Sequence, residues 1–360
     1  MLRESNPQPI HFGPVILRRS RRIPAFVPAD NVRVPHPYAF FADGWGAKCS
    51  QLLLPALLLA LLAPVPALAQ TQPITTLLLW PNGTPEPSTI TAPEKDPTSD
   101  RDRMVWGKPV IRVTNVTKPD LAVYAPAAAK NTGAAALVLP AGSYTRLNMN
   151  LDGTEICDWL NSVGMTCVLV RYRVPETQHY PENTEDLEDA QQAMRLTRAH
   201  AAEWHIDPKR IGVMGFSAGA HLAVALSTHP DFENPAATAA SGFSAPLPDA
   251  RPSFQMIFYP GWLTGKDMHA ATSLTPDANT PPTFLVQAEN DYAAHVENSL
   301  AYFLSLKDAH VPAEMHLYTL GGHDFGLRPT QLPVGQWPTL AEAWLHSIHI
   351  LGPPGPVVKP

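Results

Sequence analysis

The pattern of hydrophobic and polar positions from residue 109 onward predicts alternating strands and helices. The run at 135–139 is short and wholly apolar, as expected of a strand buried on both faces, whereas apolar residues in 184–204 recur near helical spacing. Strands are expected at 110–116, 121–124, 135–139, 166–172, 210–214, 254–259, 283–288 and 313–319, and helices at 152–163, 184–204, 218–228, 293–308 and 338–350. The first two strands should pair antiparallel around a turn. The later alternation predicts an α/β fold in which helices flank both faces of a mostly parallel central sheet.

The segments on either side of this pattern have a different character. Residues 70–105 are rich in Pro, Thr and Asp and predict an extended lead-in, and residues 353–360 predict a tail. No repeat or low-complexity linker divides residues 105–350. We therefore expect one catalytic domain over residues 106–352.

The N-terminal residues predict export. An apolar run at 52–63 follows Lys48 and precedes Ala67-Leu68-Ala69, the small-x-small pattern that signal peptidase cleaves. Residues 48–69 are therefore predicted to be a signal peptide cleaved after Ala69, which makes the protein secreted or periplasmic and leaves it without a membrane anchor. A core helix or an anchor is the alternative, which prolines in and after the run disfavour. Residues 1–47 form an uncertain leader, which a start site assigned too far upstream would explain.

Composition and charge narrow the class of protein. Hydrophobic residues make up 45% of the chain and charged residues 16%, which is typical of a globular protein. Residues 1–69 carry seven Lys/Arg and three Asp/Glu, so their removal changes the net charge from −6 to −10. Such an acidic protein is a poor partner for nucleic acid or anionic membrane. Cys157 and Cys167 would remain, either as a disulfide or as two buried thiols, and two cysteines alone make no metal site.

The sequence Gly215-Phe216-Ser217-Ala218-Gly219 carries the strongest chemical signal. It matches the pattern G-x-S-x-G and lies between a predicted strand and a predicted helix, which is the setting that this motif requires. The sharp turn presents the serine hydroxyl at the carboxyl edge of the sheet, at the positive end of the helix dipole. Ser217 is therefore the candidate nucleophile.

A serine nucleophile needs a base and an acid that orients the base, and in this setting they follow in the order Ser, Asp or Glu, His. Asp291 follows the strand at 283–288 and is the candidate acid, with Glu289 as the alternative. His323 lies on a glycine-bracketed loop after the last strand and is the candidate base. His221, four residues after Ser217, is expected to be a packing residue.

An oxyanion hole needs backbone N–H groups near the nucleophile. The Ala218 N–H should supply one, and Gly142 or Ser143, after the strand at 135–139, should supply the other; a simple turn is the alternative there. The acidic run at 185–189 is expected to face solvent at a helix N-terminus, where negative charge is favourable, rather than to form a catalytic cluster.

Over residues 78–350 the chain resembles the esterase/lipase branch of the α/β hydrolases, in particular the acetyl-xylan-esterase-like and dienelactone-hydrolase-like esterases. The resemblance rests on LWPNG at 79–83, DPKRIGVMGFSAG at 207–219 and the loop around His323. It implies acyl transfer to Ser217 with His323 as base, and it implies no cofactor or metal. One departure lies at Ala141-Gly142-Ser143, where relatives usually have three glycines.

The resulting hypothesis is a secreted serine carboxylic ester hydrolase that acts on short-chain esters, including acetylated carbohydrate such as acetyl-xylan. Short esters are favoured because roughly two dozen residues separate the strands at 254–259 and 283–288, which leaves little room for a large lid. The alternatives are a serine peptidase of the prolyl-oligopeptidase kind and a non-catalytic binding protein with the same fold.

Overall fold

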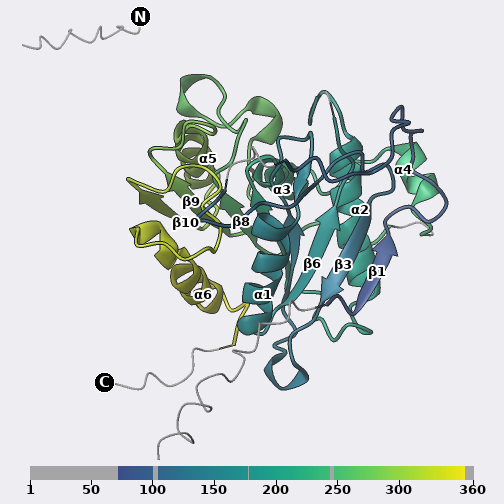
Figure 1. Ribbon diagram of the computed structural model, residues 1–360, viewed down its shortest axis with the longest axis horizontal. Coiled ribbons are helices and arrows are strands. Elements are labelled where there is room, and N and C mark those ends of the chain that lie inside the picture. The colour runs from purple at the N-terminus through teal and green to yellow at the C-terminus, as the bar shows by residue number, and fades with distance from the viewer. Residues whose placement is uncertain (1–71, 100–103, 177, 244–246, 353–360) are drawn as a thin grey trace, which may run out of the picture. The chain divides into compact units, whose positions relative to one another are not determined.

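In the computed structural model, the wholly apolar run at Ala135–Leu139 forms β4 and lies inside an eight-stranded sheet (Figure 1). The structure describes residues 72–99, 104–176, 178–243 and 247–352. The predicted leader, signal peptide and tail therefore lie outside the described residues.

The strand order in the sheet is β1-β3-β6-β4-β7-β8-β9-β10. The pairs β1–β3 and β3–β6 are antiparallel, and the remaining neighbours are parallel. A separate antiparallel pair joins β2 and β5. The bounds of the strands are β1 Thr75–Leu78, β2 Arg112–Val113, β3 Asp120–Tyr124, β5 Leu147–Asn148, β6 Thr166–Arg171, β7 Ile211–Phe216, β8 Gln255–Phe258, β9 Thr283–Ala288 and β10 Ala313–Tyr318.

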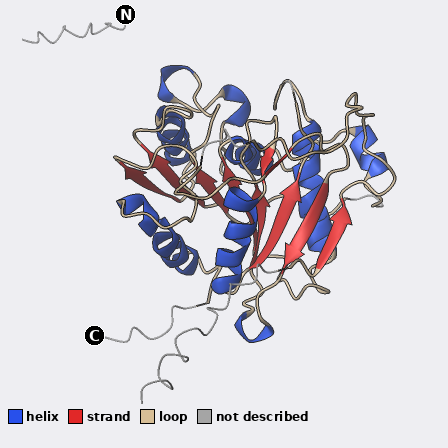
Figure 2. Cartoon of the chain, in the orientation of Figure 1, coloured by secondary structure: helices blue, strands red, loops and turns tan. Residues whose placement is uncertain are grey.

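Helices cover both faces of the sheet (Figure 2) and bury two separate hydrophobic cores. One core contains residues of α2, α3 and α5, and the other contains residues of α1 and α6. The side chains of β4 alternate between the two cores, as the pleat of a strand requires. The bounds of the helices are α1 Glu155–Ser162, α2 Glu185–Ala199, α3 Ala218–Thr228, α4 Pro235–Ala240, α5 Glu297–Asp308 and α6 Trp337–Ser347, with 3-10 turns η1 Ala128–Lys130, η3 Lys266–Met268, η4 Thr272–Leu274 and η5 Pro333–Gln336 and a π-helical turn η2 Asn150–Thr154.

The predicted mostly parallel sheet with helices on both faces is confirmed. Between β8 and β9 the chain forms only the two short turns η3 and η4, as the short separation of these strands predicts. Among the described residues, no helix is both long and apolar enough to cross a bilayer.

The pairing predicted for the first two strands is wrong. Within 110–116 only β2 is a strand, and it pairs with β5 rather than with β3. The partners of β3 are β6 and β1, and β1 comes from the segment expected to be an extended lead-in. Local pattern predicts that a strand exists, but it carries little information about a partner that lies more than forty residues away in β1 or β6.

The acidic run at the start of α2 was expected to face solvent, and this expectation is wrong. The side chains of Asp186, Glu188 and Asp189 are buried. Arg173, which is also buried, donates from its Nε and from its backbone N–H to Asp189 Oδ2, at 3.0 and 2.8 Å. Its guanidinium also lies 3.5 Å from the carboxylate of Glu188. A counter-charge that arrives from beyond the end of β6 therefore allows Glu188 and Asp189 to be buried.

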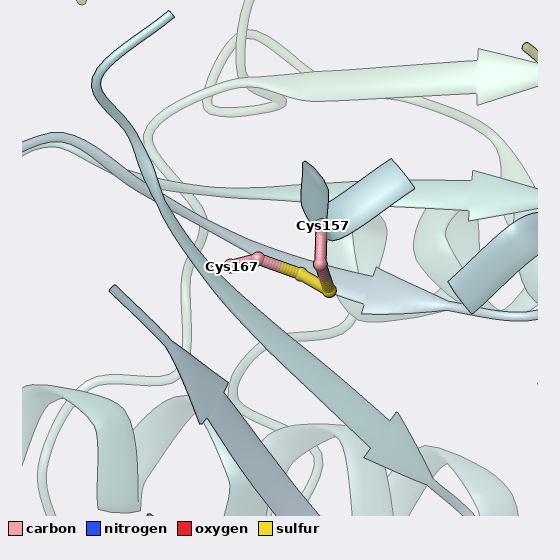
Figure 3. Close-up of a disulfide and its surroundings, with 2 residues drawn as sticks. All are labelled: Cys157 and Cys167. Atoms are coloured by element: carbon pink, nitrogen blue, oxygen red, sulfur yellow. A yellow bond between two sulfur atoms is a disulfide. The ribbon is translucent and has the colours of Figure 1, made fainter. Parts of the chain in front are cut away.

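Cys157 and Cys167, which the sequence left as thiols or a disulfide, form a disulfide (Figure 3). The bond joins α1 to β6 across a sequence separation of 10 residues, and both residues are fully buried. It therefore fastens a helix of one face to a central strand of the sheet.

Reduction of this disulfide is expected to lower the free energy of unfolding by about 2–3 kcal/mol, because the unfolded chain regains the entropy of a short closed loop. Urea unfolding with and without a thiol reductant measures the change. A Cys157→Ala/Cys167→Ala variant should show no response to the reductant. The expectation is contradicted if the reduced wild-type protein has two free thiols by thiol assay and still unfolds at an unchanged midpoint.

Candidate active site

Ser217 lies on a sharp turn between β7 and α3, with φ 51° and ψ −113°. The flanking glycines are required by steric contact. A Cβ on Gly215 would lie 2.2 Å from the carbonyl oxygen of Gly219, and a Cβ on Gly219 would lie 2.1 Å from the carbonyl oxygen of Leu139. The helix backbone therefore passes directly over the end of the sheet, and the strained serine is held at that edge.

A chain of hydrogen-bonding groups runs from Ser217 through His323 to Asp291. His323 Nε2 lies 2.9 Å from Ser217 Oγ, and His323 Nδ1 lies 2.7 Å from Asp291 Oδ2. The structure thus brings together the three residues that the sequence singled out. In the chain, Ser217 and His323 are 106 residues apart, and Asp291 and His323 are 32 residues apart. This is the geometry in which an imidazole can take a proton from a serine hydroxyl.

Asp291, rather than Glu289, is the carboxylate at the histidine. Glu289 is exposed, whereas Asp291 is 1% exposed. The backbone N–H groups of Ala293 and Ala294 each donate to Asp291 Oδ1 at 2.9 Å, and Gln287 Nε2 donates to Oδ2 at 3.1 Å. These donors stabilise a buried negative charge and fix the face that Asp291 presents to the imidazole.

Two further carboxylates influence His323. Burial lowers the pKa of His323, but the hydrogen bond to Asp291 and the charges of Asp324, Asp291 and Asp152 outweigh burial, so the net pKa is raised above its ordinary value. Asp324 Oδ1 lies 3.8 Å from His323 Nε2, too far for a hydrogen bond but close enough to stabilise an imidazolium.

Asp152 is a site residue that the sequence did not reveal. It is fully buried in η2, and its carboxylate accepts hydrogen bonds from the Tyr259 hydroxyl at 2.7 Å and from Asn148 Nδ2 at 2.9 Å. The Tyr259 ring in turn packs against the His323 ring, with centroids 5.0 Å apart. Burial, and next the charge of Asp324, raise the pKa of Asp152 to about 7. Residue 152 was expected at the start of a helix, so no signal in the sequence placed it beside the histidine.

The candidate oxyanion groups belong to two segments, the start of α3 and the loop after β4. The N–H of Ala218 belongs to the first turn of α3, where an N–H has no partner within its helix. Gly142 has φ 147°, and a Cβ there would lie 1.7 Å from the carbonyl oxygen of Arg146, so this position requires glycine. Ser143 is exposed and has φ 55°.

The loop that carries Gly142 and Ser143 is tied to α3. The hydroxyl of the buried Tyr144 lies 2.8 Å from Nδ1 of His221, one helical turn after Ser217. Burial lowers the pKa of His221 to about 3, which keeps this histidine neutral. His221 is a buried packing residue, as expected, and it also joins the loop to the helix that begins at the serine.

A cavity of about 390 Å³ opens beside His323. Its lining combines residues from the loops after β9 and β10, including Asn290, Leu320 and Asp324, with residues 104–106, which precede β2. The cavity gives a small organic ligand access to the imidazole of the hydrogen-bonded chain.

The steric account of the serine turn is testable with two glycine variants. Gly219→Ala is expected to lower the free energy of unfolding by roughly 2 kcal/mol or more, because its Cβ overlaps the backbone of β4. Gly261→Ala is the matched control, since nothing lies within 4 Å of a Cβ at that position. Urea unfolding of both variants measures the difference, and equal stabilities would contradict this account of the turn.

Comparison with known proteins shows what the chain is similar to. A family model described as BD-FAE matches residues 121–244. The chain is 28% identical over 219 residues to an acetylxylan esterase of Xylanibacter ruminicola, which covers 54% of this chain and 42% of that protein. It is 29% identical over 209 residues to an endo-1,4-beta-xylanase B of Butyrivibrio fibrisolvens, which covers 52% of this chain and 32% of that protein. The matches thus span less than half the length of these two relatives.

A solved structure shows the same fold over a larger share of the chain. An acetyl ester-xyloside bifunctional hydrolase from Caldicellulosiruptor lactoaceticus superposes with a TM-score of 0.59 at 27% identity, covering 79% of this chain and 100% of that one. The chain therefore has the α/β-hydrolase fold, and it resembles carboxylic ester hydrolases, acetylxylan esterases among them.

Proposed function

We propose that this protein is a secreted serine esterase that cleaves short-chain carboxylic esters, and that acetylated carbohydrate such as acetyl-xylan is its natural substrate class. The observation that carries the proposal is the hydrogen-bonded chain from Ser217 through His323 to the buried Asp291. A serine hydroxyl becomes a nucleophile only when a base lies within hydrogen-bond distance. Ser217 has such a base in His323.

In the proposed reaction, Ser217 Oγ attacks the ester carbonyl carbon while its proton passes to His323 Nε2. The carbonyl π electrons move to oxygen, and the N–H of Ala218 together with one from Gly142 or Ser143 stabilises that negative charge. The intermediate collapses, the bond to the alcohol oxygen breaks, and His323 returns the proton to the departing oxygen. Water then attacks the acyl-enzyme by the same steps, which releases the acid and restores Ser217.

Asp291 supports both proton transfers. It accepts from Nδ1–H of His323, which keeps Nε2 directed at the serine, and its charge stabilises the imidazolium that forms. The two backbone donors on Asp291 Oδ1 keep the carboxylate from turning away.

Two kinds of observation support the choice of substrate. The relatives named for acetylxylan and for acetyl ester-xyloside hydrolysis suggest acetyl esters on sugars. The short turns between β8 and β9 suit an open site that accepts an ester on a bulky polysaccharide. Export would bring the protein to that polymer, and both the predicted signal peptide at 48–69 and the disulfide, a bond typical of oxidising compartments, favour export.

Hydrolysis of p-nitrophenyl esters from acetate to palmitate, and of acetylated xylan, tests the proposal. We expect the highest kcat/KM on acetate, release of acetate from xylan, and a loss of at least about 10³-fold in kcat for Ser217→Ala. A fluorophosphonate should label the wild-type protein and not the variant. A preference for esters with long acyl chains would contradict the substrate assignment. Cleavage of a proline amide without any ester cleavage would favour a peptidase, and absence of labelling would favour a binding protein.

The pH dependence of kcat/KM on p-nitrophenyl acetate tests the role of His323. The neutral imidazole is the active form, so the rate should fall as pH falls through the pKa of His323, with a midpoint above the ordinary value of about 6.5. Asp324→Asn removes a negative charge near Nε2 and should move this midpoint to lower pH. A midpoint that does not respond to this substitution would contradict the influence assigned to Asp324.

A further inference from the structure

A tight hairpin at residues 105–108, where the lead-in ends, presents Trp106 to the cavity beside His323. Val105 and Lys108 exchange backbone hydrogen bonds of 3.0 and 3.1 Å, and the two residues between them, Trp106 and Gly107, have φ of 48° and 77°. A two-residue turn with both φ values positive favours Asn-Gly or Gly-Gly, and a bulky aromatic residue rarely occupies its first position. The turn itself therefore does not explain the tryptophan.

The hairpin is anchored by a buried arginine. Arg328, 3% exposed, donates from Nη1 to the carbonyl oxygens of Val105 and Lys108 at 3.0 and 2.7 Å. The same guanidinium is bidentate to the carboxylate of Glu155, with hydrogen bonds of 2.9 and 3.0 Å, at the first residue of α1. A bidentate charged pair of this kind holds the turn in one position.

Trp106 leaves a large part of its aromatic surface exposed. Its neighbour Val105 is 4% exposed and packs in a small core cluster, whereas Trp106 is 42% exposed and lines the cavity that contains His323. A large aromatic surface held rigidly at the rim of a cavity is the usual form of a binding platform, because little conformational entropy is lost when a ligand packs on it.

The polar groups of the same cavity complement this surface. Asn290 uses its amide oxygen to accept from the N–H groups of Gly321 and Gly322, at 3.0 and 2.8 Å, which leaves its NH₂ group to donate to a ligand. Asp324, a quarter exposed, offers a carboxylate that accepts from hydroxyl groups. A pyranose ring, with an apolar C–H face and hydroxyls around its edge, matches this combination.

We propose that Trp106 is the platform for the sugar ring on the alcohol side of the scissile ester. The inference rests on the proposed esterase function and deepens it by assigning the sugar's position. His323 Nε2 returns the proton to the departing alcohol oxygen, so the alcohol lies on the histidine side of the site, where Trp106 and Asp324 line the cavity. The indole packs on the C–H face of the sugar, and Asp324 and Asn290 bond its hydroxyls.

Substitution of Trp106 by Asn in the full chain distinguishes a loss of sugar binding from a loss of folding. Asn-Gly is the preferred sequence for this turn, so Trp106→Asn should fold with an unchanged or raised thermal midpoint. We expect kcat/KM on acetylated xylo-oligosaccharides to fall roughly five- to tenfold and kcat/KM on ethyl acetate to stay within about twofold. Trp106→Phe should keep most of the activity on the sugar ester. Ile111→Asn, which removes a 48% exposed apolar side chain that does not line the cavity, should change neither rate.

An unchanged kcat/KM on the sugar ester in Trp106→Asn, or an equal fall on both substrates, would overturn the platform. Its failure is distinguishable from failure of the esterase function, since ethyl acetate reports the chemistry without a sugar. If the wild-type protein hydrolyses neither ester, the esterase function fails. Calorimetric titration of xylotriose then decides the platform: a Kd raised severalfold by Trp106→Asn supports it, and an unchanged or unmeasurable affinity in both proteins overturns it.

Discussion

The close approach of α3 to the ends of β7 and β4 is the contact on which the site depends. It exists because Gly215 and Gly219 have no side chains, and it forces Ser217 into a backbone conformation that costs on the order of 1–3 kcal/mol. Buried strands on both sides hold that conformation, and the Ser217 N–H donates to the Phe258 carbonyl oxygen at 3.0 Å. The serine therefore has one position, and the other groups of the site are placed relative to it.

Those groups come from the carboxyl ends of neighbouring parallel strands, where the loops of such a sheet meet at one edge. The loops after β9 and β10 bring Asp291 and His323, and the segment after β8 brings Tyr259. Asp291 and Asp152 are both buried carboxylates, but their environments differ. Backbone N–H groups stabilise the charge of Asp291, whereas burial and the charge of Asp324 raise the pKa of Asp152 to about 7. One imidazole is thus influenced by two buried acids that lie in different environments.

The sequence predicts the chemistry of Ser217, Asp291 and His323 because each follows a predicted strand within a few residues, and the order of the three is itself informative. Asp152 and the acids of α2 could not be placed in this way. Their burial depends on Tyr259 and Arg173, which lie in other parts of the chain. The local hydrophobic pattern does not predict such distant partners. The same limit explains the wrong pairing of β2 and β3.

The lead-in shows most clearly where motif-based prediction ends. Residues 70–105 lack periodicity, yet β1 completes one edge of the sheet and the hairpin that begins at Val105 reaches the cavity beside His323. The hairpin is held by Arg328, more than two hundred residues later in the chain, so its position follows from one buried guanidinium rather than from its own sequence. In the proposed function the serine motif therefore defines the reaction, while the choice of ester is assigned to a segment outside the repeating strand and helix pattern.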